Sequence, residues 1–513
     1  MLNEQDIHQL ESKGITKAVF LDQIAHFKKG FPALQLDRPA TPGDGIRVMD
    51  ERQVEGYVRT YQERIDDFRV LKFVPASGAA TRMFKEVFAW RDLLIAGVEP
   101  DSLKDSKPEA RRFFEKMHHF PFWEDLQVVM DKDDLDADHL LKTENYLPIL
   151  DYLLFDPGLD YAALPKALIA FHRYGQDNRT AMEEHLVEGA LYAKDPSGKV
   201  DLHFTLSPEH IEAFRFRLSK VSRQYEDQYG VHYAINWSIQ KPSTDTIAVT
   251  PDNLPFREKD GSLLFRPGGH GALIENLNDL DSDLIFIKNI DNVVPDRLKE
   301  PTITYKKVLG GILIQLKEEI AFWMKQLDAG SLGPDAYMQA LDFACNGLNI
   351  DRSLFPDDEA QGAEVLRKAL DKPLRVCGMV RNQGEPGGGP FWVKDPKTGR
   401  RSLQIVEKSQ IDLKDPQQEQ LLKQSTHFNP VDIACSTKNH NGESFHLPDY
   451  IDPDTGFISH KSKNGQDLKA LERPGLWNGA MAHWNTVFVE VPLITFNPVK
   501  TINDLLRDEH QQK

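Results

Sequence analysis

The sequence predicts an α/β protein in which helices flank a mixed, mostly parallel sheet, with N-terminal helices and a helical insertion. Two observations predict this class. From residue 200 onward, apolar runs of strand length alternate with segments of helical spacing, which is typical of parallel sheets covered by helices. Two earlier stretches show helical spacing without strand signals. A chain of 513 residues is long enough for about three domains or for one large α/β unit with insertions.

The chain begins with a segment, 1–66, in which apolar residues recur at helical spacing, as in TKAVFLDQIAHFKKG and VEGYVRTYQERIDDF. The next run, FRVLKFVP, has the length of a buried strand, and it leads into ASGAATRMF, where small residues give way to a helix. Residues 86–160 are rich in charge and aromatic side chains and lack strand signals, so we expect a helical insertion. The α/β domain is expected to span 67–506, followed by a tail at 507–513.

Strand and helix patterns alternate after the insertion. Strands are expected at VDLHFTL, VHYAINWSI and SDLIFIKNI, and a helix is expected at SPEHIEAFRFRLSKVSRQY between the first two. Residues 305–372 return to helical spacing. Four more strands are expected at PLRVCGMV, PFWVKD, RSLQIVEKSQI and NTVFVEVPL.

Composition excludes several classes of protein. The net charge is −17, from 62 basic and 79 acidic residues, which argues against non-specific binding to nucleic acid or anionic membranes. Cys345, Cys377 and Cys435 are scattered and lack metal-ligand spacing, so a disulfide scaffold is not expected. The N-terminal residues do not resemble a signal peptide, and no run approaches the roughly 18 apolar residues of a membrane span. We therefore expect a cytoplasmic protein.

The segment PASGAATRMFK (75–85) combines a strand end, a turn of small residues and a helix start. This arrangement forms an anion cradle, because free backbone N–H groups and the positive end of the helix dipole face the same point. Ser77, Gly78, Thr81 and Arg82 would all reach a triphosphate. Tight strand-to-helix turns also use small residues for packing alone, and neither P-loop spacing nor GxGxxG is present.

The segment RPGGHGALIEN (266–276) packs three glycines around His270. Glycine costs about 0.5–1 kcal/mol in regular structure, so such a cluster indicates backbone that bends sharply or comes very close to another group. Gln240, in NWSIQKP, offers the donors and the acceptor that suit a nucleobase edge. A packing or capping role for His270 is the alternative interpretation.

Three further charged residues lie at the ends of expected elements. Asp291 follows a buried strand, at the edge where α/β sheets place ligands, and a lone carboxylate there suits Mg²⁺ that phosphate and water also bind. Lys166, after Pro165, and Lys500, before a short helix, would supply fixed cations for phosphate. Taken alone, Lys166 is better explained as a surface lysine and Lys500 as a solvated lysine at a helix start, and a turn residue is the alternative for Asp291.

In their order, these segments resemble the UDP-sugar pyrophosphorylase family, whose members join a sugar 1-phosphate to a nucleoside triphosphate on a GT-A-type nucleotidyltransferase fold. The matching segments are PASGAATRM, LPKAL, SIQKP, PGGHGAL, KNIDNV, QIVEKSQI, THFNPVD and NPVKTINDLL. They extend from residue 75 to residue 506 in one order. The resemblance implies a GT-A, Rossmann-like domain and a bacterial branch of that group.

The resemblance also implies roles for individual residues. Ser77, Gly78, Ala79, Thr81 and Arg82 would hold the triphosphate, and Arg82, Lys166 and Lys500 would act on its phosphates in catalysis. Gln240, Gly269 and His270 would face the base, and Asp291 would hold Mg²⁺. Gly388, Glu407 and Asn429 would meet the sugar. The implied substrates are a nucleoside triphosphate, with UTP favoured, and a sugar 1-phosphate.

The sequence departs from the family pattern in several places. The phosphate loop is rich in alanine where the family has Gly-Gly, GHGA replaces GHGD, and Lys85 competes with Lys166 as the lysine of the fingerprint. No C-terminal β-helix is expected after Lys500. These departures leave open a GT-A glycosyltransferase, which uses a finished nucleotide sugar, and a non-catalytic nucleotide or sugar-phosphate sensor.

Overall fold

The computed structural model of the protein describes residues 2–78, 80–175, 177–330, 332–384, 387–463 and 465–512. It divides into two compact units, each assembled from separate stretches of the chain. Unit 1 contains Met1–Leu71, Ser238–Ile287 and Tyr305–Leu493, and unit 2 contains Lys72–Trp237, Lys288–Thr304 and Ile494–Lys513. Among the helices described, none is both long enough and apolar enough to cross a membrane.

Unit 2 contains three adjacent strands in the order β4-β7-β8. These are β4 (Val70–Pro75), β7 (Lys199–Leu206) and β8 (His232–Ile239), with α11 (Ile211–Tyr229) between the last two. A hairpin, β5 (Ala170–Tyr174) and β6 (Asp177–Thr180), leads into α10 (Ala181–Tyr192). The Thr180 side chain accepts from the Glu183 backbone N–H and the Glu183 side chain accepts from the Thr180 N–H, a reciprocal cap that fixes where α10 begins.

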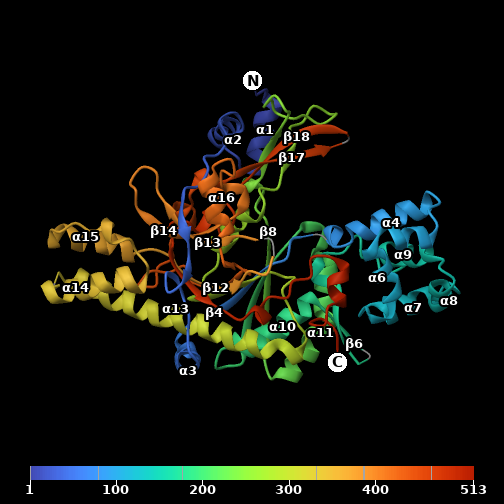
Figure 1. Cartoon of the computed structure of the whole chain (residues 1–513), viewed down its shortest axis with the longest axis horizontal. Helices are drawn as coiled ribbons and strands as arrows, with labels where there is room; N and C mark the ends of the chain where they lie inside the picture. Colours follow the sequence, from blue (N-terminus) through green and yellow to red (C-terminus); the bar gives the residue numbers. More distant parts are fainter. Residues whose placement is uncertain are drawn as a thin grey trace. The chain divides into compact units, whose positions relative to one another are not determined.

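A group of helices occupies the expected insertion in unit 2, and Figure 1 shows them gathered into one body in blue and cyan. They are α4 (Lys85–Ile95), α5 (Pro100–Ser106), α6 (Pro108–Glu115), α7 (Trp123–Asp131), α8 (Ala137–Lys142) and α9 (Tyr146–Leu154). Aromatic side chains fill their interior, where the rings of Phe114 and Tyr146 stack with centroids 3.7 Å apart. The same apolar core continues to β7, so the insertion folds as part of unit 2.

Unit 1 carries the larger part of the sheet, in the order β2-β3-β19-β12-β16-β11, with β15 paired to β12. The strands are β2 (Thr41–Pro42), β3 (Gly45–Arg47), β11 (Leu284–Lys288), β12 (Leu374–Arg381), β15 (His427–Phe428), β16 (Asp432–Ser436) and β19 (Asn485–Glu490). The pairs β2–β3, β3–β19 and β19–β12 are parallel, whereas β15 and β16 run antiparallel to β12. The predicted mixed and mostly parallel α/β class is confirmed.

Two smaller sheets complete unit 1, in the orders β1-β13-β14 and β10-β9-β18-β17. Their strands are β1 (Leu36–Pro39), β9 (Thr246–Val249), β10 (Phe265–Arg266), β13 (Gly389–Lys394), β14 (Arg401–Val406), β17 (Phe457–Lys463) and β18 (Gln466–Glu472). The unit's helices are α1 (Glu4–Lys13), α2 (Lys17–Lys29), α3 (Glu51–Arg64), α12 (Ile274–Asn278), most of α13 (Lys299–Asp328), α14 (Pro334–Asp342), α15 (Glu359–Leu370) and α16 (Pro416–Lys423). Figure 1 shows α1 and α2 beside β17 and β18, where Leu10 and Phe20 join a core with Ile247 and Leu471.

The structure differs from the expected organisation at both ends of the chain. The segment expected to be helical, 1–66, contains the short strands β1, β2 and β3, because it pairs with β13 and β19, which are too distant in sequence for local periodicity to reveal. The described part of the expected tail, 507–512, is anchored in unit 2. His510 is only 3% exposed, and the Arg297 side chain donates to the Gln511 backbone oxygen.

Candidate functional site

Three charged side chains in unit 2 come together from distant parts of the sequence. Asp291 lies shortly after β11, Lys166 follows Pro165, and Lys500 follows Val499. The Nζ atoms of Lys166 and Lys500 lie 3.0 Å and 2.9 Å from Asp291 Oδ2. Lys166 also donates to the backbone oxygen of Val499 at 2.7 Å. Three predicted site residues, 125 and 209 residues apart in the chain, therefore form one cluster.

The three charges differ in their exposure. The side chains of Asp291 and Lys166 are 9% and 13% exposed, whereas that of Lys500 is 57% exposed. Burial by itself raises the pKa of Asp291, but the two ammonium groups outweigh it and hold the pKa below its ordinary value. Burial lowers the pKa of Lys166 despite the attraction of Asp291. The cluster is thus an ionised carboxylate with one interior cation and one surface cation.

The other carboxylate oxygen of Asp291, Oδ1, is buried and has no hydrogen-bond partner among the residues that the structure describes. A buried oxygen of this kind costs free energy unless it binds a donor or a cation. Protein sites for Mg²⁺ commonly use one or two carboxylates together with substrate phosphates. Asp291 fits a Mg²⁺ site of that type. Within the described ranges, no group of three His, Cys, Asp or Glu side chains would hold a metal ion without substrate.

The predicted phosphate loop lies against the segment that carries Lys166. The backbone N–H of Lys166 donates to Gly78 O at 3.4 Å, and that of Ala80 donates to Leu164 O at 3.3 Å. The backbone oxygen of Ser77 accepts from the hydroxyl of Ser207, which lies just after β7, at 3.0 Å. The structure therefore places part of the predicted anion cradle next to the predicted lysine.

A 3-10 turn, Ala80–Arg82, separates this loop from α4. Thr81, Arg82 and Lys85 are exposed. Neither Arg82 nor Lys85 makes a side-chain hydrogen bond or an ion pair with any residue in the described part of the chain. Both therefore remain available to an anion, and the geometry does not choose between Lys85 and Lys166 as the fingerprint lysine. Ala79 lies outside the described residues.

Side chains of helix α10 form hydrogen bonds with the end of β11 and with the residue just before Asp291. Glu188 Oε1 accepts from Lys288 Nζ at 2.6 Å, and its Oε2 accepts from Lys72 Nζ at 2.9 Å. His185 Nε2 donates to the backbone oxygen of Ile290 at 3.2 Å. The side chains of Glu188, Lys72 and His185 are wholly buried, and Lys288 is 1% exposed. Although burial raises the pKa of Glu188, the two lysines keep it well below its ordinary value.

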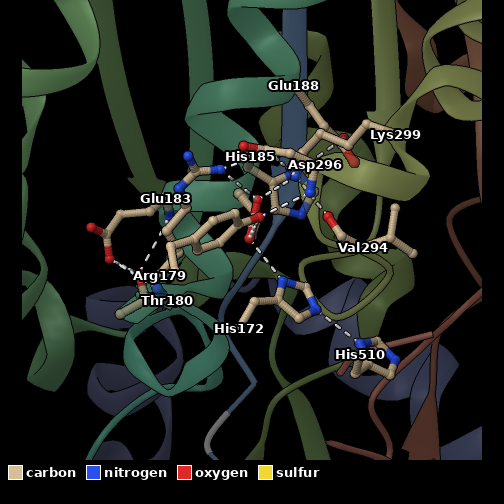
Figure 2. Close-up of polar contacts among 12 residues, drawn as sticks. His172, Arg179, Thr180, Glu183, His185, Glu188, Val294, Asp296, Lys299 and His510 are labelled. Carbon is tan, nitrogen blue, oxygen red and sulfur yellow. Dashed lines mark hydrogen bonds and ion pairs between the residues drawn. The ribbon is translucent and has the colours of Figure 1, made fainter. Parts of the chain in front are cut away.

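A second cluster around the same helix holds the residues that follow Asp291 (Figure 2). Lys299 Nζ donates to Val294 O at 2.6 Å, to Glu184 Oε2 at 2.5 Å and to Asp296 Oδ1 at 2.9 Å. The guanidinium of Arg179 binds Asp296 Oδ1 at 2.7 Å. Contacts from α10 therefore flank the candidate metal ligand on both sides along the chain.

Two buried histidines extend this cluster to the C-terminal segment, and Figure 2 shows the dashed line that joins His172 to His510. The Arg507 guanidinium, which can only donate, lies 3.4 Å from His510 Nε2, so His510 carries its proton on Nδ1. His510 Nδ1 then donates to His172 Nε2 at 2.9 Å, and His172 Nδ1 donates to Glu184 Oε1 at 2.8 Å. Burial lowers the pKa of both histidines, so this chain of hydrogen bonds is one of neutral rings.

In unit 1, neighbouring backbone explains why glycine is needed at two positions of RPGGHGA. A Cβ atom on Gly268 would lie 2.7 Å from Thr244 O, and one on Gly271 would lie 2.0 Å from Pro474 O. Side chains are therefore excluded at both positions by neighbouring backbone. The sequence leads us to expect backbone that approaches a nucleobase, and that role stays a prediction.

His270 itself is packed in a defined orientation. Its ring stacks on Trp477 with centroids 4.2 Å apart and an interplanar angle of 18°, and its Nδ1 accepts from Leu476 N at 3.1 Å. Burial lowers the pKa of His270 to about 4, so the ring is neutral and carries its proton on Nε2. Gly269 precedes it with φ 77°, and a Cβ there would lie 3.1 Å from Glu472 Oε2. His270 is thus packed against Trp477, and its contact with a base stays a prediction.

The residues predicted to meet a sugar lie together in unit 1. Asn429 N donates to Gly388 O at 2.8 Å, and a Cβ on Gly388 would lie 3.5 Å from Glu407 Cγ. Burial first, and the nearby Glu472 second, raise the pKa of Glu407. The side-chain amide of Asn429 donates to Gly378 O at 3.2 Å, and its oxygen accepts from the backbone N–H of Val431. The Asn429 side chain therefore holds the local backbone. The raised pKa of Glu407 means that its carboxyl group binds a proton more readily than usual, which suits contact with a hydroxyl.

Sequence reasoning missed the segment that joins these unit 1 residues. Glu472, at the end of β18, influences the pKa values of both His270 and Glu407. A Cβ on Gly388 would lie 3.2 Å from Asn478 Nδ2, in the loop that also carries Trp477. The Asn478 Oδ1 atom is buried without a partner among the described residues. The Asn-Gly pair at 464–465 is a strong hairpin signal between two alternating runs, and it would have revealed β17 and β18. Gln240, predicted to face the base, is half-buried directly after β8.

A family profile described as Domain of unknown function (DUF4301) matches residues 3–511, which is nearly the whole chain. The chain belongs to the DUF4301 family. No curated protein matches this DUF4301 chain.

Solved structures that are similar to the DUF4301 chain include two variants of UDP-glucose pyrophosphorylase from Leishmania major and a protein from Trypanosoma brucei described as UDP-glucose phosphorylase. One Leishmania variant, in complex with UDP-glucose, is 13% identical with a TM-score of 0.45, covering 99% of this chain and 79% of the other. The second is 12% identical with a TM-score of 0.46, covering 100% and 82%. The Trypanosoma protein is 13% identical with a TM-score of 0.45, covering 99% and 80%.

Proposed function

We propose that this DUF4301 protein is a nucleotidyltransferase that joins a sugar 1-phosphate to a nucleoside triphosphate, with UTP favoured, and releases pyrophosphate. The observation that carries the proposal is the cluster of Lys166, Asp291 and Lys500. These residues come from three of the eight segments that resemble UDP-sugar pyrophosphorylases, and they meet within hydrogen-bonding distance. If the segments resembled that family only by chance, there would be no reason for these three charged residues to lie together.

The proposal assigns different tasks to the two units. In unit 2, the loop from Ser77 to Arg82 and the two lysines would bind phosphates. In unit 1, Gln240, Gly269 and His270 would contact the base, and Glu407 would accept a hydrogen bond from the sugar. The sequence resemblance supports the unit 1 assignments, together with the mutual proximity of Gly388, Glu407 and Asn429.

The chemical step needs positioning and charge neutralisation more than covalent help. An oxygen of the sugar phosphate attacks the α-phosphorus and forms a new P–O bond, while the bond to the bridging oxygen breaks and pyrophosphate leaves with the electron pair. No general base is required, because a phosphate dianion is already a nucleophile. Arg82, Lys166 and Lys500 stabilise the charge that develops on the phosphates.

Asp291 would hold Mg²⁺ through its unpartnered Oδ1 together with the substrate phosphates. The bound ion supplies neutralisation of phosphate charge. The protein's own contribution is to keep Asp291 ionised, which Lys166 and Lys500 do by lowering its pKa. Lys500, at the surface, is able to leave Asp291 for a phosphate, whereas Lys166 is fixed by its bond to Val499 O.

The experiment that tests the proposal measures pyrophosphate release with Mg²⁺, a panel of nucleoside triphosphates and a panel of sugar 1-phosphates. We expect release that depends on one pair of substrates. Asp291→Asn keeps the shape of the side chain and removes its charge, and we expect it to abolish Mg²⁺-dependent release. Asp279→Asn, at an exposed carboxylate, is the matched control. Full activity in Asp291→Asn would contradict the metal role.

Two other outcomes would replace the proposal. Sugar transfer from a finished UDP-sugar to an acceptor, without pyrophosphate release, would identify a glycosyltransferase. Nucleotide binding without any turnover across the panels would identify a sensor.

A further inference from the structure

Unit 1 contains a cavity of about 370 Å³ that the proposed function does not use. Asp283, which precedes β11, and Leu374, which begins β12, both line it. Ser436, which ends the antiparallel strand β16, lines it as well. The cavity thus lies at the amino-terminal ends of β11 and β12. Nucleotide sites of α/β sheets lie at the carboxyl ends of strands, so this cavity is a separate feature.

The lining of the cavity combines apolar and polar side chains. Its apolar members include Phe68, Ile320, Met324, Leu370, Leu374 and Phe445. Its polar members include Lys317, Lys372, Ser436, Lys438 and His440. A volume of about 300–1,000 Å³ with a mainly apolar lining and a few polar groups is typical of small-molecule sites.

Most of the charges that line the cavity are already paired. Arg64 binds Asp67 at 3.1 Å and Glu318 at 2.7 Å. Lys438 binds Asp283 at 3.0 Å and a second aspartate just outside the cavity. Arg69 also binds both of these aspartates, so the network holds three cations and four carboxylates and has a net charge of −1.

Two lysines are not paired. Lys317 Nζ donates to Ser436 Oγ at 2.5 Å, and neither Lys317 nor Lys372 makes an ion pair with any residue that the structure describes. Burial lowers the pKa of both lysines, that of Lys317 to about 8. The unpaired acid of the lining, Asp371, is exposed, so solvent screens its charge.

Lys317 is attracted by Asp283, but Arg69 and Lys438 also bind that carboxylate, so a further anion beside Lys317 and Lys372 would offset the cost of burying their ammonium groups. His440 adds a second unsatisfied group. Its Nε2 lies 3.0 Å from Asp328, and its Nδ1 is buried without a partner in the described part of the chain. Because Nε2 donates to the Asp328 carboxylate, Nδ1 is an acceptor that suits a donor group of a ligand. The unpaired positive charge of the lining comes from the two lysines, which share the cavity with apolar side chains.

We propose that this cavity is a second ligand site, which binds a small organic acid. The carboxylate or phosphate head of the acid lies against Lys317, Lys372 and Ser436, and its apolar body lies against the apolar side chains that include Ile320 and Met324. The inference is independent of the proposed function, since no residue of the cavity belongs to the nucleotidyltransferase assignment.

Calorimetric titration of the full chain tests the proposal. Benzoate and phenyl phosphate are the probes, and comparing their binding distinguishes a site for a carboxylate from a site for a phosphate. Acetate and inorganic phosphate supply the head alone, and benzamide supplies an uncharged body. We expect one of the two aromatic acids to bind with a stoichiometry of one, and the head-only and uncharged probes to bind at least about tenfold more weakly, as loss of one favourable interaction implies.

The matched variants are Lys317→Met, which keeps most of the aliphatic stem, and Lys325→Met, at an exposed lysine of the same helix. Lys317→Met should weaken binding of the acid by about tenfold or more, since a hydrogen bond to a charged group contributes on this order. Lys325→Met should bind like the wild type. Absence of binding by both aromatic acids, or equal binding by Lys317→Met, would overturn the proposal.

A labelled wild-type protein provides the test if Lys317→Met does not fold. Reductive ¹³C-methylation of lysines keeps their charge and lets NMR follow their titration. Burial lowers the pKa of Lys166, Lys317 and Lys372, and we expect the acid to raise the pKa of the two cavity lysines but not that of Lys166, because an anion beside an ammonium group stabilises its charged form. Titration curves that the acid leaves unchanged would overturn the proposal independently of any variant.

Discussion

Asp291 is held by two cations that have unequal structural roles. Lys166 is mostly buried and also bonds the backbone at Val499, whereas Lys500 reaches the same carboxylate from the surface. Exposed ion pairs contribute only about 0–1 kcal/mol to the free energy of unfolding, because water and salt screen them. The two lysines should therefore separate function from stability.

We predict that Lys500→Gln lowers the rate of pyrophosphate release by at least about tenfold while the free energy of unfolding changes by less than about 1 kcal/mol. Lys166→Gln should lower both, with a loss of about 1–3 kcal/mol in stability, because the bond to Val499 O is lost in the interior. Urea unfolding and the release assay measure the two effects. Equal stability losses in the two variants would contradict the assignment.

The sequence was sufficient for this cluster and insufficient for the residues around His270. Lys166 begins a 3-10 turn, Asp291 lies shortly after β11 and Lys500 lies shortly before a 3-10 helix, and the order of their motifs indicated a shared task. Glu472 and Trp477 carry no such pattern. Glu472 lies beside Gly269 and Trp477 stacks on His270 only because the end of β18 and the segment after it, about 200 residues later, fold against the glycine segment. Contacts of that range leave no periodicity in either segment.

Helix α10 shows how a single element positions a loop. Its sequence AMEEHLVEGALY has the charged residues that normally mark a solvated face, yet Glu184, His185 and Glu188 are wholly buried. Buried ion pairs add little net stability, but removing one partner is strongly destabilising because the other charge is left unpaired. The clusters therefore act chiefly to fix the chain on either side of Asp291.

We predict that Glu188→Gln lowers the free energy of unfolding by about 3–5 kcal/mol, since Lys72 and Lys288 lose their shared carboxylate. A triple variant, Lys72→Met with Glu188→Leu and Lys288→Met, should be more stable than Glu188→Gln but should release pyrophosphate more slowly than the wild type. Glu212→Gln, at an exposed position of α11, is the control. A Glu188→Gln protein as stable as the wild type would refute this account of the helix.

Strands were predictable where burial on both faces produced largely apolar runs, as in β4, β11, β12 and β19, and where apolar residues alternate with polar ones, as in β7. The short strands β1, β2 and β3 were not, because β1 contains Pro39 and β2 contains Pro42, and each strand is four residues or fewer. Such strands exist only through pairing with distant partners. The helical insertion was predictable because its aromatic residues recur at helical spacing and no strand pattern interrupts them.

At the scale of the whole chain, buried histidines link stability to pH. Burial lowers the pKa of His172, His185, His270 and His510, and for His270 it lies at about 4 compared with an ordinary value of 6.5. The unfolded chain therefore binds more protons than the folded chain between about pH 4 and 6.5, so stability falls as the pH falls through this window.

We predict that the urea midpoint decreases steadily from pH 7 to pH 5, before carboxylates with lowered pKa values begin to contribute. Each unit of pKa depression corresponds to about 1.4 kcal/mol at acid pH. His270→Phe keeps a ring to stack on Trp477 and should reduce this pH dependence, whereas His118→Phe, at a side chain that is 56% exposed, should not. A midpoint that stays constant between pH 7 and 5 would exclude the linkage.

The burial of His510 has a practical consequence for anyone who shortens the protein. Polar segments outside helices and strands are the usual sites for trimming, because they rarely contribute to a fold. Here the turn that carries His510 places an imidazole at the end of a row of hydrogen bonds reaching Glu184. Removing this turn would take away the partner of His172 Nε2 inside unit 2, so a shortened form of the protein should keep the residues up to and including His510.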